Sequence, residues 1–306
     1  MLRTIGIKGS IENLLLLSRP YASDKDISFS GLKRAYKKFL FHVQPTVPTS
    51  SHDSVELLRD VHRTKTLISL FAEKSRLDDF DHIFSNEAQF EAHLEQVELH
   101  LQKLKEIDDQ LYSLFSLVIN ILFSGPSKLA NGGSSSGAIG CIWINSRPTW
   151  NSQDFLEFFI HEMTHNLIFL DEYRYHHYTD YSGMFLEENY TTSAILAKRR
   201  PLDKVFHSIL VSTEVLLSRR DILGNPEFPS LHPPTSIMLN KTIEAIDSIE
   251  NNQNIHILLT PRGKELIRVC KEHLKEICPI LSLPSSRELA AVSDFNDAAF
   301  ASNLIY

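Results

Sequence analysis

The pentapeptide His161-Glu162-Met163-Thr164-His165 has the residue types and spacing of a metal-binding helix. Side chains four residues apart lie one turn apart on the same helical face, so both imidazoles can bind one ion. Glu162 is offset by about 100° and can reach a water molecule or a substrate beside that ion. The pattern predicts His161 and His165 as metal ligands and Glu162 as a catalytic residue. Two histidines without a metal are the alternative.

A third ligand is needed, and the downstream sequence offers two kinds. Glu187 and Glu188 belong to a predicted helix over residues 185–198, at a spacing similar to that of zinc proteases with a downstream glutamate ligand. His207 belongs to a helix that we expect to start near Pro201, because proline suits the first turn of a helix. The choice between the glutamates and His207 stays open at this point.

The segment before the motif predicts the elements that hold it in place. Residues 138–144 form a short apolar run with strand character, and residues 145–150 follow as a loop. Asn151 or Ser152 can then cap a helix whose first turn carries Asp154, favourable at the positive end of the helix dipole. We interpret the glycine- and serine-rich residues 131–137 as a flexible loop.

The first half of the chain is predicted to be helical. Apolar residues from Phe90 to Leu114 recur at three/four spacing, which predicts a long core helix, with a coiled-coil seam as the alternative. A second predicted helix, residues 31–42, places Lys33 and Lys37 on a face that we expect to be solvated. The expected fold is mainly α (α+β), a helical bundle with a small β element packed beside the H-E-x-x-H helix. Residues 1–125 form a predicted N-terminal region, and residues 126–306 the predicted catalytic region.

Composition excludes several classes of protein. The 306 residues carry 31 Lys+Arg against 38 Asp+Glu, a net charge of -7, which argues against nucleic-acid binding through a broad basic surface. No segment reaches the roughly 20 apolar residues of a membrane span, so we expect no membrane partner. Only three cysteines occur, which is typical of reduced thiols. The expected location is cytoplasmic.

The order of elements around the motif is more specific than the pentapeptide. A serine-rich loop leads to Gly137-Ala138-Ile139-Gly140, and the H-E-x-x-H helix follows. Arg199-Arg200-Pro201-Leu202 then precedes a helix that opens Val205-Phe206-His207-Ser208. In this order, residues 131–224 resemble the HExxH-type peptide β-hydroxylases. That family is associated with the maturation of ribosomally synthesised, modified peptides.

The resemblance implies an oxygenase that uses Fe(II), 2-oxoglutarate and O2 to hydroxylate an unactivated side-chain carbon of a peptide. Carried over, His161 and His165 would bind Fe(II), and His207 stands where the family has His or Gln. Arg199 or Arg200 would bind a carboxylate of 2-oxoglutarate, since guanidinium matches carboxylate in a bidentate fork. Glu188 would complete the set of two histidines and one carboxylate that is typical of non-haem Fe(II) oxygenases. This assignment follows from the ligand chemistry and not from a match to the family.

Two other functions remain open. In a zinc metallopeptidase the same two histidines would hold Zn2+ and Glu162 would be the general base. In a non-catalytic scaffold, the basic Lys33/Lys37 face and the Phe90–Leu114 stripe would grip a partner. Recognition of a leader segment of the peptide substrate by residues 1–125 is a further hypothesis.

Overall fold

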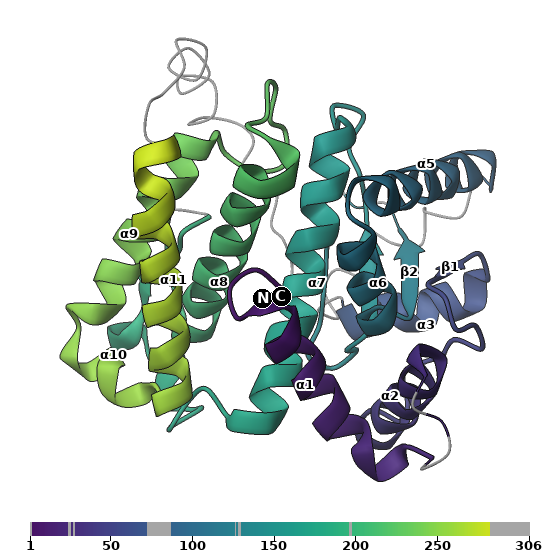
Figure 1. Ribbon diagram of the computed structural model, residues 1–306, viewed down its shortest axis with the longest axis horizontal. Coiled ribbons are helices and arrows are strands. Elements are labelled where there is room, and N and C mark those ends of the chain that lie inside the picture. The colour runs from purple at the N-terminus through teal and green to yellow at the C-terminus, as the bar shows by residue number, and fades with distance from the viewer. Residues whose placement is uncertain are drawn as a thin grey trace. The chain divides into compact units, whose positions relative to one another are not determined.

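Helices make up most of the chain and a small mixed sheet accompanies them, which confirms the fold class expected from the sequence (Figure 1). The computed structural model describes residues 2–281 apart from 24–25, 27, 72–86, 126, 128–129 and 196–197. Contacts divide these residues into two units. We call residues 11–156 the sheet unit, and residues 2–10 with 157–281 the histidine unit.

The strands of the sheet unit are short, and all but the first are fully buried. The sheet has the order β1 (Glu56–Leu58), β2 (Ile121–Ser124), β4 (Cys141–Ile144) and β3 (Gly132–Gly133). The first three are parallel, and β3 runs antiparallel to β4. Every residue of β2 and β4 is buried, which explains why their sequences are apolar except for Ser124. The predicted strand is therefore confirmed over Cys141–Ile144.

The segment expected to be a flexible loop, residues 131–137, is partly ordered by this sheet. Gly132 and Gly133 pair with Ile144 and Trp143, so β3 lies inside the segment. Residues 131–134 are buried. The loop prediction was wrong for Gly132 and Gly133, because glycine composition alone does not reveal a neighbouring strand that can accept a partner.

Helices cover the rest of the sheet unit. They are the end of α1 (Gly6–Ser18), α2 (Phe29–Val43), α3 (Val61–Phe71), α5 (Glu87–Ile107) and α6 (Asp109–Val118), with the short η1 (Arg19–Tyr21). The predicted long helix is broken at Asp108, whose side chain accepts a hydrogen bond from the N–H of Leu111 and so caps α6. Its apolar stripe is buried, which confirms the core interpretation: Phe90, Leu94, Val97, Leu101, Leu104, Leu111 and Leu114.

The prediction of a solvated basic face on α2 is wrong for Lys33. Its side chain is fully buried, and Nζ donates to the carbonyls of Ser116, Leu117 and Ile119 at 2.6, 3.1 and 3.0 Å. These carbonyls belong to the C-terminal end of α6 and the residues after it, where helical hydrogen bonding leaves acceptors unsatisfied. Burial, together with the charge of Lys37, lowers the pKa of Lys33 well below its ordinary value. The ammonium is a helix cap and not part of an exposed basic surface.

Replacing Lys33 with methionine should lower the free energy of unfolding by about 1–3 kcal/mol, because buried carbonyls lose their donor. Urea denaturation measures the change. The exposed Lys38 on the same helix supplies the control, and K38M should leave stability unaltered. Equal stabilities of K33M and K38M would contradict the capping role.

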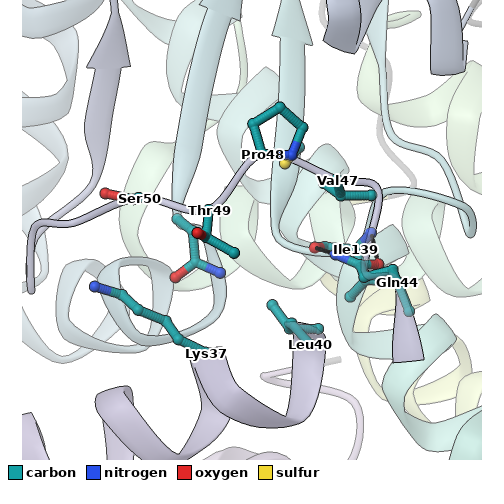
Figure 2. A pocket seen from close by; sticks show the side chains of 10 residues that line it. Lys37, Leu40, Gln44, Val47, Pro48, Thr49, Ser50 and Ile139 are labelled. Atoms are coloured by element: carbon teal, nitrogen blue, oxygen red, sulfur yellow. Dashed lines mark hydrogen bonds between the residues drawn. The ribbon is translucent and has the colours of Figure 1, made fainter. Parts of the chain in front are cut away.

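The loop after α2 is fastened to the segment before β4. The Gln44 side-chain amide donates to the carbonyl of Ile139, and its oxygen accepts from the Ile139 N–H, both at 2.8 Å. Figure 2 shows Gln44 and Ile139 together at one side of the cavity that Lys37 and Leu40 also line. The volume of this cavity is about 10 Å³, enough for about one water molecule and too small for a substrate.

The histidine unit is built from helices. They are α7 (Ser152–Tyr175) from Glu157 onward, α8 (Leu202–Ser218), α9 (Thr235–Glu250), α10 (Gln253–Leu258) and α11 (Pro261–Leu281). α8 packs against α9 and α11, and the three helices lie side by side in Figure 1. The carboxylate of Glu214 on α8 accepts hydrogen bonds from the backbone N–H groups of Arg3 and Thr4, which ties residues 2–10 to this unit.

The predicted helix over residues 185–198 is wrong. The described part of this segment contains η5 (Glu187–Asn189) and strand β5 (Thr191–Thr192), and η4 (Gly183–Phe185) overlaps its start. β5 pairs with β6 (Arg199–Arg200). The Asn189 side chain donates to the carbonyl of Gly183, and the Arg199 guanidinium donates to the carbonyls of Glu187 and Tyr190. These side chains satisfy backbone acceptors that a helix would otherwise satisfy itself.

Contacts place the boundary between the two units inside α7, between Leu156 and Glu157. The predicted division at residue 125 concerns which part carries chemistry and stays a prediction. Residues 282–306 of the predicted catalytic region lie outside the described residues. Within the described ranges, every helix is too short or too polar to cross a membrane.

Candidate metal centre

The H-E-x-x-H motif lies in the middle of α7, as the sequence predicts. Asn151 caps the helix: its side-chain oxygen accepts from the N–H groups of Gln153 and Asp154. The Asp154 carboxylate accepts in return from the Asn151 N–H at 2.9 Å. This reciprocal cap satisfies donors that the first helical turn leaves open. The start of α7 is therefore defined by its own sequence.

The two motif histidines point their Nε2 atoms at each other. These atoms are 3.2 Å apart, and both side chains are fully buried. Two nitrogens that each lie about 2.0–2.1 Å from one ion in tetrahedral geometry are about 3.3 Å apart. The His161–His165 pair therefore has the spacing of two ligands of one metal ion.

The protonation of the cluster suits a metal as well. Burial lowers the pKa of His161, His165 and His207 well below the ordinary histidine value, and neighbouring positive charges add to the effect. All three imidazoles are therefore neutral at physiological pH. A neutral imidazole has one nitrogen with a lone pair, which is the form that binds metals.

Each motif histidine is held at Nδ1 by another histidine. Nδ1 of His161 lies 2.8 Å from Nε2 of His232, and Nδ1 of His165 lies 2.9 Å from Nδ1 of His207. A histidine ligand commonly has its second nitrogen fixed by such a hydrogen bond. The structure brings the predicted ligand His207 into the cluster, on the Nδ1 side of His165. Its role as a ligand stays a prediction.

Behind His232 lies a buried ion pair. Arg219 donates through Nε and Nη2 to the two carboxylate oxygens of Glu157, both at 2.8 Å, and His232 Nδ1 lies 2.9 Å from Glu157 Oε2. Burial alone would raise the pKa of Glu157, but the charge of Arg219 and the hydrogen bonds from His232 and Arg219 lower it to about 2. Glu157 is therefore a charged carboxylate inside the unit.

Arg219 also fixes the loop that carries His232. Its Nη1 donates to the carbonyl of Pro233 at 2.9 Å and to the Thr235 hydroxyl at 3.1 Å. Arg219 itself opens a single π-helical turn, η6 (Arg219–Leu223), directly after α8. Such turns are rare and often occur at functional sites. One side chain thus joins α7, the end of α8 and the His232 loop.

The Glu162 carboxylate lies next to the His161–His165 pair. Its oxygen Oε1 is 3.9 Å from Nε2 of His161, and the side chain is fully buried. Its catalytic role stays a prediction.

Three of the other predicted site residues are exposed and lie outside the buried histidine cluster. Glu187 and Glu188 are exposed on η5, so neither joins the buried cluster. Arg199 is exposed on β6 and donates to backbone carbonyls, whereas Arg200 is half-buried. Within the described part of the chain, no three His, Cys, Asp or Glu side chains are already arranged around one metal position. The site is a two-histidine pair, and its third ligand stays open.

Sequence reasoning missed Glu157, Arg219 and His232. Glu157 precedes His161 by the same four-residue step that separates His161 from His165. This spacing places Glu157 on the same helical face as the two histidines and could have identified it. Arg219 and His232 come from elements far along the chain. Nothing in their local sequence connects them to α7.

A second buried cluster lies near the end of α7. Asp171 accepts a hydrogen bond from His177 Nε2 at 2.8 Å and pairs with Arg262, whose Nη2 and Nε lie 2.8 and 3.0 Å from its two oxygens. Burial alone would raise the pKa of Asp171, but hydrogen bonds from His177 and Arg262 and the charge of Arg262 lower it to about 2. This cluster joins α7 to α11.

Asp171→Asn should therefore destabilise the protein in a pH-dependent way. Because the folded pKa of Asp171 is depressed, its contribution is present above about pH 4 and is lost as pH falls toward about 2. The expected loss is about 2 kcal/mol at pH 7 and clearly smaller at pH 3. Urea unfolding of both proteins at the two pH values measures it, and an equal loss at both would contradict the ionic role.

Comparison with known proteins leaves the site to be interpreted from its own geometry. The chain matches no family model and no curated protein.

Proposed function

We propose that this chain is a metal-dependent enzyme that hydroxylates a side-chain carbon of a peptide, with Fe(II) and 2-oxoglutarate. The observation that supports it is the His161–His165 pair, with buried, neutral rings and Nε2 atoms 3.2 Å apart. The choice of iron and 2-oxoglutarate comes from the resemblance of residues 131–224 to the HExxH-type peptide β-hydroxylases. Bound Fe(II) would supply the activation of O2, with 2-oxoglutarate as the co-substrate.

Each residue of the proposed site has a separate role. His161 and His165 would hold the ion, and the burial of both rings keeps bulk water away from it. Glu162 would orient a ligand or a water molecule at the site. Arg199 or Arg200 would bind the 2-oxoglutarate carboxylate, as the resemblance implies. The peptide substrate, with or without a leader recognised by residues 1–125, completes the proposal.

The position of Glu162 favours a second candidate, a zinc-dependent metallopeptidase. Its carboxylate lies 3.9 Å from the ligand nitrogen of His161, where a general base could take a proton from an attacking water. In that enzyme Glu162→Gln abolishes turnover, whereas a hydroxylase with Glu162 in an orienting role keeps part of its activity.

An anaerobic titration tests the first proposal. The protein is loaded with Fe(II) and titrated with 2-oxoglutarate while the visible charge-transfer band of the chelate is recorded. A saturable band that is lost in His161→Ala supports the hydroxylase. Absence of the band, with zinc retained through purification, overturns it and favours the peptidase.

A further inference from the structure

A line of buried hydrogen-bonding groups runs from Arg219 to the Nε2 atom of His161. Arg219 pairs with Glu157, Glu157 contacts His232 Nδ1, and His232 Nε2 contacts His161 Nδ1. None of these four side chains is more than 2% exposed. Water therefore cannot compete for the bonds, and the direction of each bond follows from the group before it.

The direction is set by the carboxylate. Ionised Glu157 can only accept, so His232 must carry its hydrogen on Nδ1 and donate it to Glu157. Arg219 already balances the charge of Glu157, so a second hydrogen on buried His232 would leave an uncompensated cation in the core. With its one hydrogen on Nδ1, His232 has its lone pair on Nε2 and accepts from His161 there. His161 in turn carries its hydrogen on Nδ1, which leaves a lone pair on Nε2, the atom that faces His165.

We infer that Arg219, Glu157 and His232 are positioning residues that hold His161 in the tautomer whose Nε2 is ready to bind a metal ion. The inference deepens the proposed function and rests on it for the identity of the site as a metal centre. Arg219 is needed because it keeps Glu157 ionised. An ionised carboxylate can only accept hydrogen bonds, so it cannot become the donor to His232.

The same direction continues on the other side of the pair in the metal-free protein. His161 Nε2 accepts from His165 Nε2–H, and His165 Nδ1 accepts from His207 Nδ1–H. One hydrogen thus lies between the two Nε2 atoms, where the ion would be. When the ion binds, His165 must carry its hydrogen on Nδ1 and His207 on Nε2, so no proton is gained or lost. Only the hydrogens of His165 and His207 change position, because His161 and His232 already carry theirs on Nδ1.

Two variants of His232 test the direction. In His232→Gln the side-chain N–H can donate to Glu157 while the amide oxygen accepts from His161, so the direction is preserved. His232→Leu removes both bonds. Long-range 1H–15N NMR of the metal-free protein reports the tautomer of His161, and competition with a chromogenic chelator reports Zn2+ affinity.

We expect the Nδ1–H tautomer of His161 in the wild type and in H232Q, with near wild-type Zn2+ affinity in H232Q. In H232L the tautomer is no longer held, and Zn2+ affinity should fall about 10- to 100-fold. The matched control is His256→Leu, the same substitution at an exposed histidine of α10, which should keep both the tautomer and the affinity of the wild type.

The tautomer of His161 in the metal-free wild type is measured without any variant. The inference is therefore tested even if H232L does not fold.

Two results would overturn the inference: an Nε2–H tautomer of His161 in the metal-free wild type, or unchanged Zn2+ affinity in H232L. Failure of the proposed function gives a different pattern. In that case the wild type binds no metal, and the His161 tautomer is still Nδ1–H in the wild type and is still released in H232L.

Discussion

Replacing Arg219 with methionine should lower the free energy of unfolding by about 3–5 kcal/mol. The guanidinium is the bidentate partner of Glu157, whose side chain is buried, and both distances are 2.8 Å. Removing one member of a buried ion pair leaves the other charge without compensation. The variant also loses the bonds from Arg219 to Pro233 and Thr235, which hold the loop of His232. Urea denaturation of the metal-free protein measures the effect.

Two controls separate the buried pair from a general effect of losing an arginine. The neighbouring Arg220 pairs with Asp221 at the surface, so R220M should cost less than about 1 kcal/mol. The double variant E157M/R219M removes both buried charges and should recover much of the stability lost in R219M. A loss in R219M no greater than that in R220M would show that Arg219 does not compensate Glu157.

The features that local sequence encodes were predicted well. The Asn151 cap and the proline at position 201 mark the starts of α7 and α8, which begin at Ser152 and Leu202. The four-residue spacing of His161 and His165 needs only a helix to place both rings on one face. The apolar run that becomes β4 needed only its own composition.

The failures have a common physical origin in long-range partners. Lys33 lies in a run of charges that normally indicates a solvated face, yet carbonyls at the end of α6 bind it in the core. Residues 185–198 have helical composition, but Arg199 and Asn189 bind the backbone of the segment and hold it in turns. His232 belongs to a His-Pro-Pro loop, and its contacts with His161 and Glu157, far away in the sequence, connect it to the site.

The third ligand is the main open point of the site, and alanine variants of the three sequence-predicted histidines address it. A full set of four ligands contributes about 10–16 kcal/mol to zinc binding, so one ligand accounts for about 3–4 kcal/mol. H161A and H165A should therefore lower Zn2+ or Co2+ affinity on the order of 100- to 1000-fold. Chelator competition measures this, and the exposed His256 gives the control H256A with unchanged affinity.

H207A then decides between the two roles open to His207. Its Nδ1 atom contacts Nδ1 of His165, on the side of the ring away from the Nε2 pair, so we expect it to act by holding His165. Loss of such a partner lowers metal affinity about 10- to 100-fold, less than the loss of a ligand. The d–d spectrum of Co2+ should keep its intensity in H207A, since the ligand set is unchanged. An affinity loss as large as that of H165A, with an altered Co2+ spectrum, would instead identify His207 as the third ligand.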